Sequence, residues 1–201
     1  GVSFNLVDLK PIAASFLRKL FFMAPEPVGT VSRSGYARPF LPAGRNLKVD
    51  WLLGGATVWS RDVIRDNPHP LSIKTRWAVC EDLMYSYPLR HTHLMLACCD
   101  ADAYHNENYN ENNLKVSVFH GVSSTVMRYH FVRCNVELST PAFVWMTIGI
   151  ICGHLGVAVQ GNKRALGLSL GMIEGLIRIF VSALSGCSSF DLARQLCVMR
   201  A

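Results

Sequence analysis

The sequence lacks the clustered charge of a nucleic-acid-binding protein. Its 20 Lys and Arg residues exceed its 14 Asp and Glu residues and give a net charge of +6, but the basic residues are scattered. We therefore expect no nucleic-acid partner, whereas this charge suits an anionic phosphate or an anionic lipid surface. A secretory signal is also missing, and the chain begins with Gly1 rather than Met. We expect it to be a piece of a longer protein.

A disulfide framework is missing as well. The 7 cysteines include no C-x-x-C pair, and several stand in apolar runs. This pattern favours a reducing compartment and buried free thiols. The segment with His91, His93, Cys98 and Cys99 offers residue types that bind zinc, but two adjacent cysteines cannot easily bind one ion. A strand with ordinary core cysteines is the favoured interpretation.

The first two thirds of the chain predict a mixture of helices, strands and loops. Apolar residues recur at three- and four-residue steps in segment 5–25, which predicts an amphipathic helix. The other expected elements are a loop at 26–46, a short strand before Gly54, helices beginning at Ser60 to Asp62 and at Glu81, a buried strand from Leu94 to Cys98 and a helix at 123–135.

The last third has little charge. Residues 141–159 carry no formal charge, and residues 165–186 carry only Glu174 and Arg178, whose four-residue spacing allows a pair on one helix face. Each segment is near the length that spans a bilayer, and its glycines allow close helix contact. An interfacial or soluble helical hairpin is the competing interpretation. We divide the chain into a domain at 1–136 and a hydrophobic, membrane-associated helical tail at 137–201.

Two adjacent acids stand in the apolar and aromatic run "WAVCEDLMYS". Burying a carboxylate without a partner is costly. Glu81 and Asp82 are therefore expected either at a solvated helix N-terminus, where acids are favoured, or at a site that uses them.

These acids belong to an ordered set of motifs, "WLLGGATVWSRDVI", "CEDLMYSYPLR" and "DADAYHNE". In this order the set resembles the second half of family 2 glycosyltransferases, over about residues 28–136. The matching positions are Trp51, Gly54, Gly55, Arg61, Glu81, Asp82, Leu83, Ser86, Leu89, Arg90, Ala101 and His105. The resemblance implies an α/β fold, the C-terminal half of a GT-A domain, followed by a hydrophobic helical hairpin.

The activity that the resemblance implies is inverting transfer of a sugar from a nucleotide-sugar donor to a hydroxyl of a sugar or glycolipid acceptor. A hydroxyl is a poor nucleophile, so a carboxylate must take its proton as the new bond forms. Asp82, which matches the family's second acid, is expected to be this base. Glu81 is expected either to orient the acceptor or to pair with a basic group such as Arg90.

The same resemblance suggests binding roles for residues outside the acid pair. Trp51, Gly54 and Gly55 would form the acceptor floor, although a Gly-Gly pair also suits a tight packing turn. The remaining assignments are Arg128 and Arg133 to the diphosphate and His105 to a divalent metal, Mn or Mg. Basic helix residues are usually solvated, and a loop histidine can simply be hydrogen-bonded, so both alternatives stay open.

One expected part is absent. No nucleotide-binding half and no Asp-x-Asp motif precede the Gly-Gly segment. We therefore expect the C-terminal portion of an enzyme of cell-surface polysaccharide or glycolipid synthesis, at the cytoplasmic face of the cell membrane. By itself this portion would be inactive, because without the missing half it would bind the nucleotide sugar poorly. The divalent metal would be bound mainly by the missing motif. The alternatives are a non-catalytic membrane-anchored remnant or assembly subunit, and a small integral membrane protein without sugar chemistry.

Overall fold

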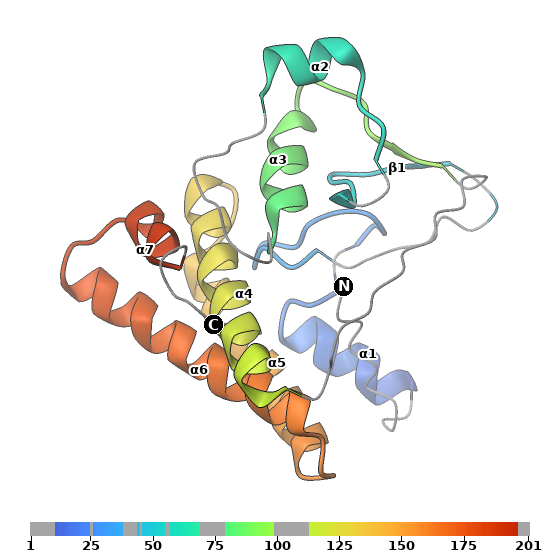
Figure 1. The fold of residues 1–201 in the computed structure, drawn as a ribbon. Coiled ribbons are helices and arrows are strands. Elements are labelled where there is room, and N and C mark those ends of the chain that lie inside the picture. Colours follow the sequence, from blue (N-terminus) through green and yellow to red (C-terminus); the bar gives the residue numbers. More distant parts are fainter. Residues whose placement is uncertain are drawn as a thin grey trace.

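A computed structural model of the protein describes residues 11–24, 26–37, 44, 46–54, 57–68, 79–98 and 113–196. Most of these residues are helical (Figure 1). The helices are α1 (Pro11–Leu20), α2 (Arg61–Asp66), α3 (Glu81–Leu89), α4 (Leu114–Cys134), α5 (Thr140–Ala158), α6 (Lys163–Leu184) and α7 (Ser189–Gln195). The strands are β1 (Leu47–Lys48) and β2 (Leu96–Ala97), which pair antiparallel, with Leu47 opposite Ala97.

The predicted α/β GT-A fold is therefore wrong. Within the described ranges, β1 and β2 form one two-stranded sheet, and no parallel sheet is present for helices to cover. The predicted buried strand at 94–98 is half exposed: Met95 is buried, whereas Leu94 and Leu96 face solvent. Alternate side chains are exposed because a sheet with one covered face buries only every second residue.

The centre of the fold is the contact between α4 and α6. Three glycines of α6 lie one turn apart and face small groups of α4. A Cβ on Gly167 would lie 2.6 Å from Ser117 Cβ, and one on Gly175 would lie 2.8 Å from Thr125 Cβ. Between them, a Cβ on Gly171 would overlap the backbone carbonyl of Val118. The two helix backbones can approach this closely only because the side chain is missing.

Helix α5 completes this bundle and joins it to α1. Phe21, just after α1, lies over Gly149, where a Cβ would overlap its ring. The same ring stacks on Trp145 at 5.2 Å, and Trp145 Nε1 donates a hydrogen bond to the Leu20 carbonyl at 2.9 Å.

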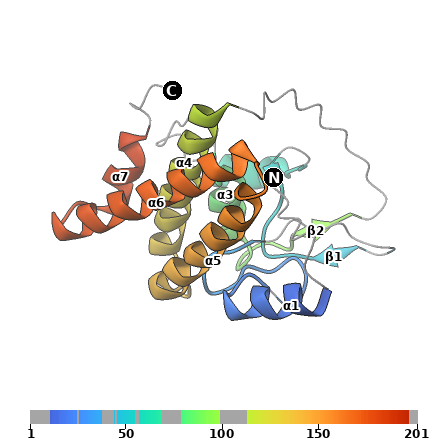
Figure 2. The same ribbon diagram turned by 90° about the horizontal axis from the view of Figure 1, so that it is seen from below.

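In Figure 1, α1, α5 and α6 lie at the bottom and α2 and α3 at the top. Figure 2 views the lower side, with α3 behind the other helices.

Helix α3 packs on α4 through an aromatic contact. Tyr87 and Phe131, both buried, meet edge to face at 5.2 Å. At the end of α3, Arg90 lies 3.4 Å from the Tyr87 ring and pairs with Glu137 in the turn before α5. The predicted domains, 1–136 and 137–201, contact one another in two places. Arg90 of the first pairs with Glu137 of the second, and α4 of the first packs on α6 of the second.

Candidate active site at the start of helix α3

The acid pair lies at the N-terminus of α3. Glu81 is exposed and Asp82 is half-buried, in the first turn, where the helix dipole favours negative charge. The preceding residue, Cys80, occupies the left-handed region with a φ of 63° and provides no side-chain cap. A non-glycine residue in this region is uncommon, and such positions occur often at functional sites.

The acid pair touches the Gly-Gly segment. The Gly54 amide donates to Asp82 Oδ2 at 3.5 Å, and the Leu83 amide donates to Asp82 Oδ1 at 2.8 Å. A Cβ on Gly54 would lie 3.2 Å from Asp82 Cβ and 4.0 Å from Glu81 Oε1. A side chain at position 54 would therefore press against the Asp82 side chain and approach the Glu81 carboxylate.

A buried serine fixes this arrangement. Ser86 Oγ donates to the Asp82 carbonyl at 2.6 Å and accepts a hydrogen bond from the Leu52 amide at 3.1 Å. Its side chain is fully buried, so these bonds replace those that water would make. Ser86 thus joins one turn of α3 to the backbone two residues before Gly54.

The other predicted acceptor residues are placed differently. Trp51 is 4% exposed and belongs to the hydrophobic core together with Leu83 and Phe131. In this conformation its indole offers no open face on which a sugar can stack. Gly55 lies outside the described residues.

The two predicted diphosphate residues lie in separate places. Arg128 of α4 approaches Cys80: burial raises the pKa of the Cys80 thiol, while the charge of Arg128 and a hydrogen bond from it oppose this rise. Asp82 raises the same pKa further, so Arg128 and Asp82 both lie near this thiol. The guanidinium also lies over the Tyr36 ring, at 5.8 Å. Its Nε is buried and has no hydrogen-bond partner among the described residues.

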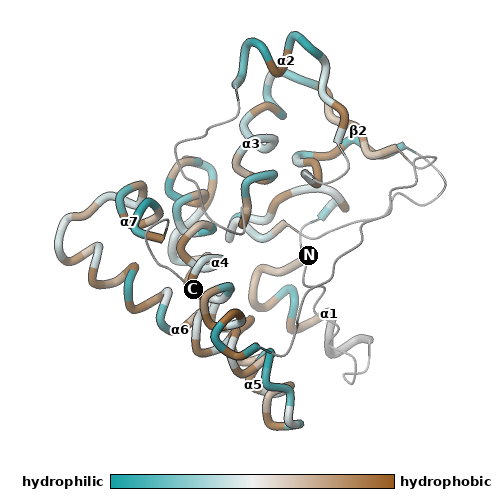
Figure 3. Tube along the Cα trace, viewed as in Figure 1, coloured by the Kyte–Doolittle hydropathy of each residue, from teal (hydrophilic) through white to brown (hydrophobic). Residues whose placement is uncertain are grey.

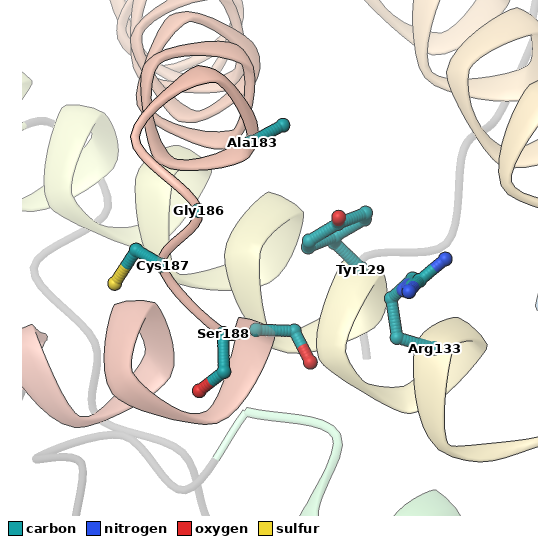
Figure 4. A pocket seen from close by; sticks show the side chains of 7 residues that line it. Tyr129, Arg133, Ala183, Gly186, Cys187 and Ser188 are labelled. Atoms are coloured by element: carbon teal, nitrogen blue, oxygen red, sulfur yellow. The ribbon is translucent and has the colours of Figure 1, made fainter.

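Arg133 is exposed in the last turn of α4 and lines a different cavity, of about 490 Å³. Figure 4 shows this cavity between the end of α4 and the connection from α6 to α7. The other lining residues are Tyr129, Ala183, Gly186, Cys187, Ser188 and Ser189. Neither acid of α3 lines it, so Arg133 lies apart from the acid pair, whereas Arg128 lies beside Cys80, the residue that precedes the two acids.

The expected Glu81–Arg90 pair does not form, because Arg90 pairs with Glu137 instead. His91 Nε2 lies 3.9 Å from the same carboxylate. His105, the predicted metal ligand, lies outside the described residues, as does Cys99. Among the residues that the structure describes, no group of three His, Cys, Asp or Glu side chains is placed to hold a metal ion.

The expectation of buried thiols is only partly met. Cys80 and Cys187 are partly covered, whereas Cys98, Cys134 and Cys152 are exposed. Cys98 is exposed because it follows the same alternation as the rest of its strand. Sequence reasoning also gave no role to Cys80 or Ser86. The signal for Ser86 was its position, one helical turn after Asp82 and on the face that turns inward.

The comparisons with known proteins identify no relative: no protein-family model, curated protein or solved structure matches this chain.

Proposed function

We propose that this chain contributes the acceptor side of a membrane-associated glycosyltransferase, with Asp82 as the general base. The observation that carries the proposal is the contact between Gly54 and Asp82, two positions 28 residues apart in the sequence. The proposal concerns the chemistry of this site and does not depend on an α/β fold.

The surroundings of Asp82 suit a base that acts on a hydroxyl. Two amides, of Gly54 and Leu83, hold its carboxylate oxygens, which fixes the direction of the group. Position 54 has no side chain to press against it, since a Cβ there would lie 3.2 Å from Asp82 Cβ. In this role Asp82 takes the proton of an acceptor hydroxyl bound beside its carboxylate as that hydroxyl attacks the anomeric carbon.

Arg128 is the group in this region with the charge to receive an anion. A departing nucleoside diphosphate gains negative charge, which a guanidinium or a divalent cation can neutralise. We propose Arg128 for this role and leave Arg133 out of the site. Glu81 is exposed, and its Oε1 lies 4.0 Å from the point that a Cβ at position 54 would occupy, so it would orient the acceptor there.

The two apolar helices support a place at the membrane. α5 and α6 are long and apolar enough to cross a bilayer, with a mean hydropathy of 1.6 over an 18-residue window in each. We propose that the enzyme works at the cytoplasmic face, where a nucleotide-sugar donor is available and a glycolipid acceptor can reach the site.

The decisive experiment is sugar transfer by the intact protein carrying Asp82→Asn. Membranes containing this variant are incubated with a panel of radiolabelled nucleotide sugars and a divalent cation, and labelled lipid and polysaccharide are counted. Asn keeps the shape of the side chain and can accept from one of the two amides, of Leu83 or Gly54, but it cannot take a proton. We expect a loss of about 10²–10⁴-fold in transfer with unchanged folding.

The matched control is Asp66→Asn, the same chemical change at an exposed carboxylate that pairs with Arg65 on α2. It should transfer sugar at the parent rate. Full transfer by Asp82→Asn would remove the base assignment. Absence of transfer by the unchanged intact protein with every donor would favour the non-catalytic assembly subunit.

A further inference from the structure

Helix α6 presents a continuous apolar stripe that the described structure leaves uncovered. Its members recur at three- and four-residue steps along the whole helix and are between 38% and 74% exposed. They are Leu166, Leu170, Ile173, Ile177, Phe180, Val181 and Leu184. Figure 3 shows α6 and α5 rich in hydrophobic residues along the lower side of the molecule. An exposed apolar surface of this extent marks an interaction site.

Helix α5 and the end of α1 extend this stripe. Exposed apolar residues of α5 include Trp145, Ile148 and Leu155, at steps of three and seven residues, which are about one and two turns. Trp145 donates a hydrogen bond to the carbonyl of Leu20, the last residue of α1. Leu20 is 43% exposed, so α1 adjoins the same surface. A tryptophan with a satisfied N–H and a partly exposed ring is typical of the boundary between lipid and water.

Basic residues border the stripe. Lys163 is exposed and begins α6 just before Leu166; Lys19, in the last turn of α1 beside Leu20, is paired with Glu26 at 3.3 Å. The whole chain carries +6. Lys and Arg next to an amphipathic helix are attracted to anionic lipid headgroups. Charge and hydrophobicity therefore indicate the same occupant, an anionic bilayer surface.

The packing of α4 argues against a spanning hairpin. α4 lies against α6 from Gly167 to Gly175, in contacts too close to contain lipid. If α6 crossed the bilayer in this fold, α4 would have to enter it with the charged Arg128, since Thr125 lies against Gly175. The ion pair of Glu174 and Arg178, at 2.7 Å, would also lie near the middle of the membrane. Charged side chains at that depth are strongly unfavourable.

We infer that the α5–α6 hairpin lies flat in the interface of an anionic bilayer, with the stripe of α6 toward the lipid and α4 on the opposite, aqueous side. This inference rests on the membrane association proposed above and not on sugar transfer. It fixes the orientation of the protein, because the turn between α5 and α6 then stays on the same side of the membrane as the turn between α4 and α5.

The orientation is tested by labelling from one side of sealed membrane vesicles prepared from expressing cells. Gln160→Cys adds a thiol in the α5–α6 turn, and Val136→Cys adds one at a position that is 99% exposed before α5. A membrane-impermeant polyethylene-glycol maleimide adds a fixed mass to each thiol that it reaches. The number of adducts on each variant is compared with the number on the parent, which carries only the native cysteines. We expect both variants to gain one adduct from the same side. Adducts from opposite sides would overturn the flat orientation and leave membrane association intact.

The lipid-facing surface is tested by flotation of the purified chain with vesicles. Binding should be at least tenfold stronger to a phosphatidylcholine–phosphatidylglycerol mixture than to phosphatidylcholine alone. The double variant Ile177→Gln, Phe180→Gln should lose tenfold or more of this binding, while Val136→Gln should bind as the parent does. Equal binding by the double variant would overturn the role of the stripe. Failure of the parent chain to bind either vesicle would overturn membrane association itself.

Discussion

Replacing Gly171 by Ala should destabilise the protein, although alanine is the better helix former. The new methyl carbon would lie 2.9 Å from the Val118 carbonyl carbon and 3.0 Å from Gly121 Cα, and it would overlap the Val118 oxygen. Carbon atoms pack at about 3.5–4.0 Å, so α4 and α6 must separate. Overpacking of this kind costs about 1–3 kcal/mol, and contact with backbone atoms puts this case at the upper end. The higher helix propensity of alanine offsets about 1 kcal/mol of this cost.

The expected net loss is about 1–2 kcal/mol, or about 2–8 °C in Tm for a chain of this size. The matched control is Gly156→Ala on α5, where nothing lies within 4 Å of the new Cβ. That change should stabilise the protein by about 0.5–1 kcal/mol, because only the propensity gain remains. Thermal unfolding in mild detergent, followed by far-ultraviolet circular dichroism, measures both. If Gly171→Ala proved as stable as Gly156→Ala, the close contact of α4 and α6 would be refuted.

Three further changes test other parts of the structure. Ser86→Ala should cost about 1–3 kcal/mol in denaturant unfolding, because it leaves the Leu52 amide without its buried acceptor; an unchanged midpoint would contradict that bond. Glu137→Gln should cost about 1 kcal/mol by removing the charge that pairs with Arg90; Arg90→Gln should cost more because it also removes the contact with Tyr87, and adding Glu137→Gln to it should then cost nothing further, whereas additive losses would contradict the pair. Burial lowers the pKa of His130, as it does those of His120 and His154, so the folded state disfavours their charged forms; stability should fall as pH drops below about 6.5, and His130→Asn should remove part of that decline in a pH series of melts, whereas an unchanged slope would exclude a contribution from His130.

The sequence predicted the helical tail well because its signals are local. Two uncharged or nearly uncharged segments appear as α5 and α6, and the residues that cap them are typical ones. Ser139 accepts from the Ala142 amide and Asn162 from the Ala165 amide. Such caps can be recognised from a polar residue at the start of an apolar run.

The partner of each surface was harder to predict. The glycines of α6 indicated close helix contact, but nothing in their spacing says that α4, rather than α5, makes it. The first half of α4 was missed because Leu114–Gly121 mixes small, polar and apolar residues without a clear period. Tertiary contact with α6 supplies the stabilisation that local pattern does not.

The strands were overestimated for a related reason. Short apolar runs do not distinguish a covered strand from an irregular segment, and the described part of the chain holds one pair of two-residue strands. In the site, the Gly54 amide lies 3.5 Å from Asp82 Oδ2, while the shared role that the ordered motifs suggest for them stays a prediction. The prediction assigned both Arg128 and Arg133 to one diphosphate. The two residues are five positions apart and therefore fall on different faces of α4, and Arg133 lines a separate cavity.

The central claim is that Asp82 accepts a proton from an acceptor hydroxyl, and sugar transfer by the intact protein with Asp82→Asn tests it most directly. With a folded protein and the parent's membrane association, we predict transfer reduced by about 10²–10⁴-fold, while Asp66→Asn keeps the parent rate. Transfer by Asp82→Asn at the parent rate would contradict the claim.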